Sequence, residues 1–139
     1  RGKKIYICKS VNSKRKSNLG GEYMKIVVGG QIDKENVAKI IKENFPEAEI
    51  TIKSDLDAAM DIKSENADYY FGACNTGGGG ALAMAIAIVG ADKCATLASP
   101  GNVLSEEKIK EEVDKGKTCF GFTPQVADQV IKITAKYLK

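Results

Sequence analysis

Hydrophobic positions along the chain follow two periods that alternate. Short runs rich in β-branched and aromatic residues are typical of buried strands, whereas apolar residues that recur every three or four positions are typical of helices. The strand-like runs are residues 25–29, 49–53, 68–73, 94–98 and 117–122. A stretch with helical spacing follows each of them, so the pattern predicts five strand–helix units.

Signals for helix starts support this division. Ser54 and Ser105 stand before first turns that carry acidic residues, and Asp33 can cap the first helix. Thr123 and Pro124 have the arrangement of an N-cap followed by proline at the first helical position. The predicted helices therefore begin where the strand-like runs have ended.

Strands that alternate with helices favour parallel pairing and right-handed crossovers, and hence a three-layer α/β/α sandwich. Five strands indicate a five-stranded parallel sheet in the flavodoxin-like order 2-1-3-4-5. In such sheets ligands bind outside the carboxyl ends of the strands, at the switch point between strands one and three. The loops after strands one, three and four are therefore the predicted ligand site. Their candidate binding residues are Gly29, Gly30, Gln31, Asn75, Thr76, Gly77, Gly78, Gly79, Gly80, Ser99, Gly101 and Asn102.

The loop after strand three contains four consecutive glycines, from Gly77 to Gly80, before a helix that ends at Val89. This helix is apolar on all sides, and we expect it to be buried. A glycine run that enters a helix N-terminus directs main-chain N–H groups toward one point, which favours a phosphate or carboxylate. The run lacks the lysine of a P-loop, and a dinucleotide fingerprint would follow strand one. The alternative is that the glycines only permit close packing of helix and sheet.

Composition narrows the chemistry. The 139 residues are 43% hydrophobic and 28% charged, which is typical of a globular domain, and no apolar run reaches the roughly 18 residues of a membrane-spanning helix. There is no histidine, and the four cysteines show no metal-ligand spacing. We therefore expect free thiols in a reducing cytoplasm, and neither a metal nor a cofactor.

The positive charge is concentrated in residues 1–23, which carry seven Lys or Arg and one Glu, whereas the remaining residues sum to −3. A basic arm can bind nucleic acid, but this segment has no helical period. The residues from Gly20 to Met24 can be encoded by GGA-GGN-GAA-TAT-ATG, a ribosome-binding sequence ahead of a start codon. We therefore expect a basic leader over 1–23, disordered or not native, a single α/β domain over 24–139, and no nucleic-acid partner.

Three segments carry a resemblance to a known family. MKIVVGGQ, DLDAAMDIKSENADYYFGACNTGGGGALAMAIAIVG and FGFTPQ are similar to the uncharacterised YhfU-like bacterial protein family, whose members have a DYYIGACNTG-type segment. The resemblance covers essentially all of residues 24–139. It implies a fold and a place for the site.

A more distant resemblance implies an activity. A cysteine after strand three, followed by a glycine loop and a small-residue helix, resembles the RpiB and LacA sugar-phosphate isomerases, whose motif reads CGTGIGMSIAANK. The resemblance matches Cys74 to their proton-transfer base and residues 77–80 to the loop that holds the enediolate oxygen. Their Asp-His pair after strand one is replaced here by Gly29, Gly30 and Gln31. The ring-opening and phosphate-binding roles of that family are therefore unfilled.

The prediction for function is a cytoplasmic α/β protein that binds a small anionic metabolite, with a phosphorylated one favoured, at the glycine-rich loop. One alternative is a Cys74-dependent enzyme resembling the sugar-phosphate isomerases. Another is a non-catalytic subunit of a transport or phosphotransferase-like system, because the domain resembles cytosolic B-type subunits of sugar phosphotransferase systems. In those that use cysteine, it lies at the end of strand one, where this chain has glycine.

Two further expectations concern partners. We expect no membrane insertion. An apolar stripe along the last helix predicts a homodimer, because apolar area beyond what one core needs often marks a subunit contact. The residues of this stripe and its extension are Val126, Val130, Ile131, Ile133, Tyr137 and Leu138.

Overall fold

The computed structural model describes residues 24–77 and 80–138. Strands and helices alternate along them as the sequence predicts. The strands are β1 (Lys25–Gly30), β2 (Glu49–Ile52), β3 (Tyr69–Ala73), β4 (Cys94–Thr96), β5 (Ala98–Ser99), β6 (Asn102–Val103) and β7 (Cys119–Phe122). The helices are α1 (Lys34–Asn44), α2 (Asp55–Lys63), α3 (Ala83–Val89), α4 (Glu106–Asp114) and α5 (Ala127–Leu138), with short 3₁₀ turns η1 (Ala91–Lys93) and η2 (Pro124–Val126).

Five parallel strands form the main sheet in the order β2-β1-β3-β7-β4. The three-layer class, the parallel sheet and the switch point between β1 and β3 are confirmed. The predicted order 2-1-3-4-5 needs one correction, because the last strand, β7, lies between β3 and β4. All four residues of β7 are buried, which suits an interior strand, whereas β4 ends in the exposed Thr96, which suits an edge.

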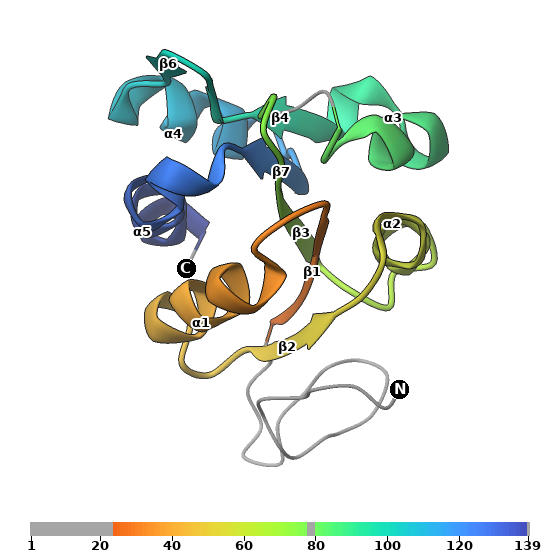
Figure 1. The fold of residues 1–139 in the computed structure, drawn as a ribbon. Helices are drawn as coiled ribbons and strands as arrows, with labels where there is room; N and C mark the ends of the chain where they lie inside the picture. The colour runs from red at the N-terminus through yellow and green to blue at the C-terminus, as the bar shows by residue number, and fades with distance from the viewer. Residues whose placement is uncertain (1–23, 78–79, 139) are drawn as a thin grey trace.

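Helices cover both faces of the sheet (Figure 1). Helices α1, α4 and α5 pack together on one face, and α2 and α3 pack against each other on the opposite face. Successive strand residues point to opposite faces, so Ile26 and Val28 join the first core whereas Val27 joins the second. This arrangement leaves the carboxyl ends of the strands between the two helical layers.

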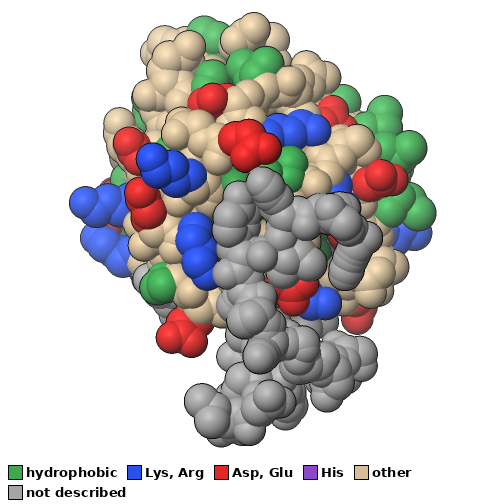
Figure 2. Space-filling model, turned by 60° about the horizontal axis from the view of Figure 1, so that its bottom comes forward, with side chains coloured by type: hydrophobic (Ala, Val, Ile, Leu, Met, Phe, Trp, Pro, Cys, Tyr) green, Lys and Arg blue, Asp and Glu red, His purple; other side chains and the backbone are tan. Residues whose placement is uncertain are grey.

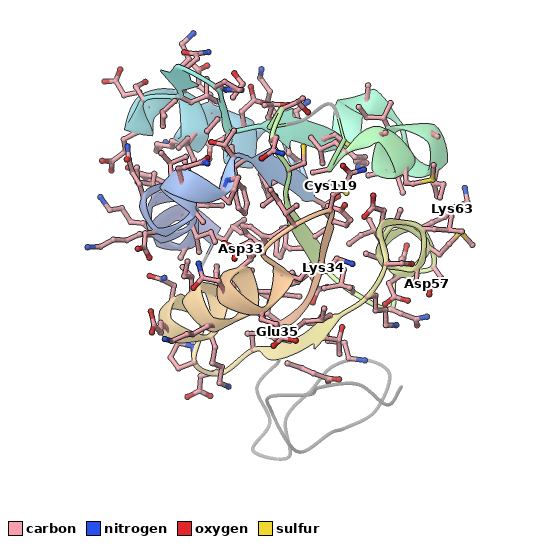
Figure 3. The ribbon with its side chains drawn as sticks, in the orientation of Figure 1. Asp33, Lys34, Glu35, Asp57, Lys63 and Cys119 are labelled. Carbon is pink, nitrogen blue, oxygen red and sulfur yellow. The ribbon has the colours of Figure 1, made fainter. Side chains whose placement is uncertain are left out.

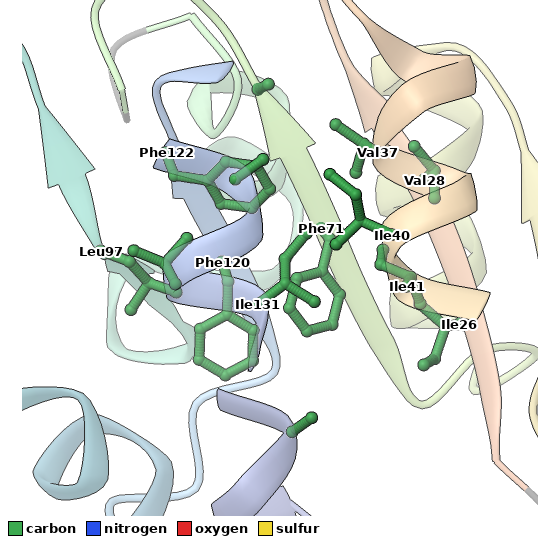
Figure 4. Close-up of a cluster of buried hydrophobic side chains, with 14 of the residues drawn as sticks. Ile26, Val28, Val37, Ile40, Ile41, Phe71, Leu97, Phe120, Phe122 and Ile131 are labelled. Carbon is green, nitrogen blue, oxygen red and sulfur yellow. The ribbon is translucent and has the colours of Figure 1, made fainter. Parts of the chain in front are cut away.

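Aromatic side chains fill the centre of the larger core. The ring of Phe71 lies 5.3 Å from that of Phe120 and 6.4 Å from that of Phe122, centroid to centroid. Figure 4 shows these rings facing Ile131 of α5. Phe71, Phe120 and Phe122 are fully buried, so the strand ends that carry the loops stand on a tightly packed base.

Two of the four predicted helix caps make a capping hydrogen bond. The Ser54 hydroxyl accepts a hydrogen bond from the Asp57 N–H at 3.1 Å, and the Ser105 hydroxyl accepts one from the Lys108 N–H at 3.3 Å. Asp33 stands before α1 (Figure 3), but its side chain makes no capping bond. Its backbone is left-handed, with φ of 59°, and its carboxylate accepts a bond from the Asn36 side chain instead. Thr123 and Pro124 stand at the start of η2 in the predicted arrangement, but the Thr123 side chain makes no capping bond.

Helix α3 differs from the prediction in length and in burial. It begins at Ala83, after a turn, and spans seven residues. Met84 and Ile86 are 39% and 43% exposed, so the apolar helix is not buried on all sides. The second helical layer contains only α2 and α3, and no further element covers their outer faces among the described residues.

The predicted leader, residues 1–23, lies outside the described residues. The division of the chain into a leader and a domain therefore stays a prediction. On the face shown in Figure 2, Lys side chains and acidic side chains are interspersed among the described residues. None of the helices in the described part of the chain is long and apolar enough to span a lipid bilayer.

Candidate functional site

The loops that follow β1, β3 and β4 meet at one edge of the sheet, as predicted. The N–H groups of Gln31 and Ile32 donate to the carbonyl oxygen of Ala73 at 2.9 and 3.3 Å, which fastens the first loop to the end of β3. A Cβ placed on Gly80 would lie 2.7 Å from the side-chain oxygen of Gln31, and one placed on Gly77 would overlap the carbonyl oxygen of Ala98. The three loops are therefore in contact.

Cys74 is the first residue after β3, and its sulfur lies at the centre of the following loop. Its Sγ accepts a hydrogen bond from the Ala81 N–H at 3.2 Å and lies 3.2 Å from the Thr76 hydroxyl. As a thiol it also donates to the Gly77 carbonyl at 3.5 Å. Thr76, Gly77 and Ala81 of the following loop thus all contact one sulfur atom.

These contacts favour the thiolate form of Cys74. Burial raises the pKa of the thiol, but hydrogen bonds from the Thr76 hydroxyl and from the N–H groups of Ala81, Thr76 and Gly80 together outweigh burial and bring the pKa below the usual value. A cysteine with a lowered pKa is a better base and nucleophile at neutral pH than an ordinary thiol. Cys74 is therefore the residue with the most distinctive chemistry at this edge.

Two main-chain N–H groups of the glycine loop have hydrogen-bond partners within the loop itself. The Gly77 N–H donates to the Cys74 carbonyl at 3.2 Å, and the Gly80 N–H donates to the Thr76 hydroxyl at 3.1 Å. Together with the Ala81 N–H, these groups hold the loop around Cys74. Gly78 and Gly79 lie outside the described residues, so their predicted role as binding residues stays a prediction.

The sequence analysis missed Tyr70 of β3, whose side chain reaches the end of β1. Gly29 is a strand residue in register with Gly72, and the ring of Tyr70 covers it. The hydroxyl of Tyr70 accepts a bond from the Gly30 N–H at 3.1 Å and donates to the carbonyl of Ala81. The signal in the sequence was a tyrosine in a central strand beside glycines, which permits a ring to lie flat on the sheet.

The loop after β4 forms a small hairpin of β5 and β6 that was not predicted. Ser99 pairs with Asn102 across a turn made by Pro100 and Gly101, whose φ is 75°. This sequence fits a type II turn, which favours proline followed by glycine. Gly101 and Asn102 are exposed and Ser99 is partly exposed, and their predicted role as binding residues stays a prediction.

Apart from the exposed carboxylate of Asp33, the polar side chains of the three loops are neutral. Asn75, Thr76 and Gln31 are exposed, and the three loops contain no Lys or Arg. Lys34, at the start of α1, donates to the carbonyl of Lys53 at 2.8 Å. No group of three or more acidic, His or Cys side chains suited to a metal occurs among residues 24–77 and 80–138.

The five-stranded parallel sheet with helices on both faces defines a class of small three-layer α/β protein with solved examples. The type B ribose 5-phosphate isomerase of Trypanosoma brucei has a similar fold, with a TM-score of 0.62 and 14% identity over 84% of this chain and 86% of that one. The Trypanosoma cruzi enzyme gives a TM-score of 0.60 and 12% identity over 84% of each chain. The resemblance to these isomerases is thus confirmed for the fold.

The chain itself belongs to the family described as protein of unknown function DUF2620, which matches residues 24–138. It is 40% identical over 116 residues to the uncharacterized protein YhfU of Escherichia coli K12, covering 83% of this chain and 98% of that protein. The Shigella flexneri YhfU protein gives the same identity and coverage. The predicted membership of the YhfU-like family is confirmed.

Proposed function

We propose that this protein binds a small anionic metabolite at the carboxyl edge of β1, β3 and β4, and that Cys74 acts there as a proton-transfer base. The observation that carries the proposal is the sulfur of Cys74, which accepts hydrogen bonds at the switch point of the sheet and has a lowered pKa. Ligands of parallel α/β sheets bind at this point. We retain the prediction of a cytoplasmic location.

The reaction that fits a thiolate base at this site is the interconversion of a hydroxy-aldehyde and a hydroxy-ketone. The thiolate removes a proton from the hydroxyl-bearing carbon next to the carbonyl group, which leaves an enediolate. The hydroxyl proton passes to the former carbonyl oxygen, and the thiol returns the first proton to the former carbonyl carbon. No oxidant or reductant is consumed. The exposed amides of Asn75 and Gln31 can donate hydrogen bonds to the oxygens on which negative charge develops.

A sugar phosphate is the substrate class that we favour, because the two solved structures with this fold are described as ribose 5-phosphate isomerases. Because the three loops contain no lysine, arginine or histidine, we propose that neutral hydrogen-bond donors bind the phosphate. The usual acid–base group for ring opening is also missing, since the whole chain has no histidine. We therefore propose that the open-chain form of the sugar is used.

Ribose 5-phosphate is the first compound with which to test this proposal. At a concentration about 100-fold above its Kd, a ligand stabilises the folded state by about 2.7 kcal/mol, so a rise of several degrees in the midpoint of thermal unfolding is expected. In D₂O, proton transfer is expected to place deuterium on the carbon next to the carbonyl, which NMR detects. If ribose 5-phosphate and a panel of four- to six-carbon sugar phosphates give neither result, the proposal is wrong.

A binding subunit without catalysis is the second candidate, and one observation favours it. Cys74 is only 2% exposed, and its sulfur already contacts Thr76, Gly77 and Ala81. A sulfur so enclosed can serve to hold the loop for a ligand rather than to react. Thermal stabilisation by a sugar phosphate without deuterium exchange would establish this second function.

The apolar stripe of α5, from which the homodimer was predicted, is not the surface through which we expect two copies to associate. In α5, Val130 and Ile131 are fully buried, and Ile133 and Leu138 pack against the same core, so this stripe serves the domain itself. Most of the large exposed apolar side chains belong instead to α2 and α3, the helices at the right of Figure 1, and apolar side chains are visible at the right of Figure 2. We name this surface, formed by Leu56, Met60, Met84 and Ile86, the α2–α3 apolar face.

We propose that two copies associate through the α2–α3 apolar face. Light scattering is then expected to give the mass of a dimer for the wild-type protein and of a monomer for Ile86→Glu, because association would bury an unpaired carboxylate in the interface of each copy. Val103→Glu is the matched control, since Val103 is an exposed apolar residue on β6. A monomeric wild-type protein, or a dimer in Ile86→Glu, contradicts the proposal.

A further inference from the structure

Tyr70 is a fully buried tyrosine whose ring lies flat against the sheet. A Cβ on Gly29 would lie 2.9 Å from one edge of the ring, and a Cβ on Gly72 would lie 2.9 Å from the other edge. Gly29 and Gly72 are paired across β1 and β3. These two glycines therefore create the space in which the ring of Tyr70 crosses from its own strand to the end of β1.

The hydroxyl of Tyr70 connects two chain segments that are far apart in sequence. It accepts a hydrogen bond from the Gly30 N–H at 3.1 Å and donates one to the carbonyl of Ala81. The N–H of the same Ala81 donates to the Sγ of Cys74 at 3.2 Å. Hydrogen bonds thus link the end of β1 to Tyr70 and Tyr70 to the carbonyl of Ala81, and the N–H of the same residue bonds the sulfur.

We propose that Tyr70 is a positioning residue, which holds the Ala81 N–H on the Cys74 sulfur and ties the loop after β3 to the end of β1. The inference rests on the proposed function in so far as Cys74 is the reacting group. Tyr70 lies behind Cys74 and does not take part in the proton transfer itself.

The bonding capacity of the tyrosine hydroxyl supports this role. Without the hydroxyl, the Gly30 N–H and the Ala81 carbonyl are left buried without their partner, and a buried main-chain group in that state turns toward another partner or water. The carbonyl and the N–H of Ala81 belong to successive peptide groups joined at its Cα, so a displacement of the residue that gives the carbonyl a new partner also shifts the N–H relative to the sulfur. The Ala81 side chain is itself fully buried, so few alternative positions keep both bonds.

The hydroxyl keeps its proton over the pH range in which a thiol titrates. Burial raises the pKa of Tyr70, and the negative charge of Asp55, at the start of α2, raises it further. The other titratable groups near Tyr70 are the buried thiols of Cys94 and Cys119. The bond from Tyr70 to Ala81 is therefore present both when Cys74 is a thiol and when it is a thiolate.

The test is the titration of Cys74 in Tyr70→Phe, followed through the carbon-13 shift of its Cβ and assigned by comparison with Cys74→Ser. Phenylalanine keeps the ring between Gly29 and Gly72 and removes only the hydroxyl. The midpoint of titration is expected to rise by about one pH unit, which makes the thiolate about tenfold scarcer at pH values below the midpoint.

Two matched variants bracket this result. Tyr69→Phe makes the same change on the opposite face of β3, where the ring lies 6.4 Å from that of Phe120, and is expected to leave the midpoint unchanged. Thr76→Val removes the hydroxyl that lies 3.2 Å from the sulfur and is expected to raise the midpoint. If Thr76→Val raises the midpoint and Tyr70→Phe leaves it unchanged, Tyr70 is only a structural residue and the inference is overturned.

The wild-type protein provides an independent check that does not depend on the folding of a variant. The amide protons of Gly30 and Ala81 are expected to exchange slowly with deuterium, since both are buried and bonded. Rapid exchange at either position contradicts the inference. The titration of Cys74 and the exchange of the two amide protons need no ligand. Failure of this inference can therefore be told apart from failure of the proposed function, whether or not ribose 5-phosphate binds.

Discussion

Gly77→Ala is expected to destabilise the domain by roughly 2–5 kcal/mol, whereas Gly101→Ala is expected to cost only about 1 kcal/mol. Both glycines have a left-handed backbone, with φ of 85° and 75° respectively. A side chain in this conformation is strained wherever it occurs. The difference between the two variants comes from their surroundings.

A Cβ on Gly77 would overlap the carbonyl oxygen of Ala98 and approach the Cα of Ser99 to 2.9 Å, whereas a Cβ on Gly101 would have no atom within 4 Å. The loop after β3 must therefore move away from β5 in Gly77→Ala. Urea unfolding of the two variants measures the difference. Equal losses in the two proteins would show that the loop after β3 does not pack against β5 in solution.

Cys74→Ser is expected to lower the rate of deuterium exchange into the sugar phosphate by roughly 10²–10⁴-fold, the usual contribution of a general base. Serine keeps the size and the hydrogen-bonding capacity of the side chain, but its hydroxyl does not ionise near neutral pH. Thermal stabilisation by the same sugar phosphate is expected to remain. The variant thus separates loss of proton transfer from loss of binding.

The matched control is Cys94→Ser, at another cysteine of the same fold. Cys94 is also a buried free thiol, and its sulfur donates to the carbonyl of Gly90, a bond that a serine hydroxyl can replace. Normal exchange is expected in this variant. Normal exchange in Cys74→Ser would instead show that Cys74 is not the base.

The pH dependence of exchange follows from the direction of the pKa shift. Hydrogen bonds to Cys74 outweigh its burial and lower the pKa of the thiol, so the thiolate forms at a lower pH than in an ordinary cysteine, for which the pKa is about 8.5. The rate of exchange is therefore expected to rise with pH up to this lowered pKa and to level off above it.

The sequence by itself determined the layers of this protein and the place of the candidate site. The two hydrophobic periods are local properties, because each strand or helix presents its apolar side chains at a spacing set by its own backbone. The caps at Ser54 and Ser105 were predictable for the same reason, since a capping bond joins residues three positions apart. The switch point then selected the loop that contains Cys74, without knowledge of any contact.

The tertiary structure alone decided the features that depend on neighbours across the sheet. Whether β7 or β4 lies next to β3, and how much of α3 remains exposed, depends on which elements pack together rather than on the period of either. Gly29 appears in the sequence as a loop residue of the site, but its Cα faces the ring of Tyr70, 41 positions away along the chain. The bonds that hold Cys74 could not be predicted from the sequence for a related reason. Hydrogen bonds between distant segments form only when the packed sheet brings their donors and acceptors together. The Tyr70 hydroxyl therefore meets the Gly30 N–H and the Ala81 carbonyl only after β1 and β3 have paired.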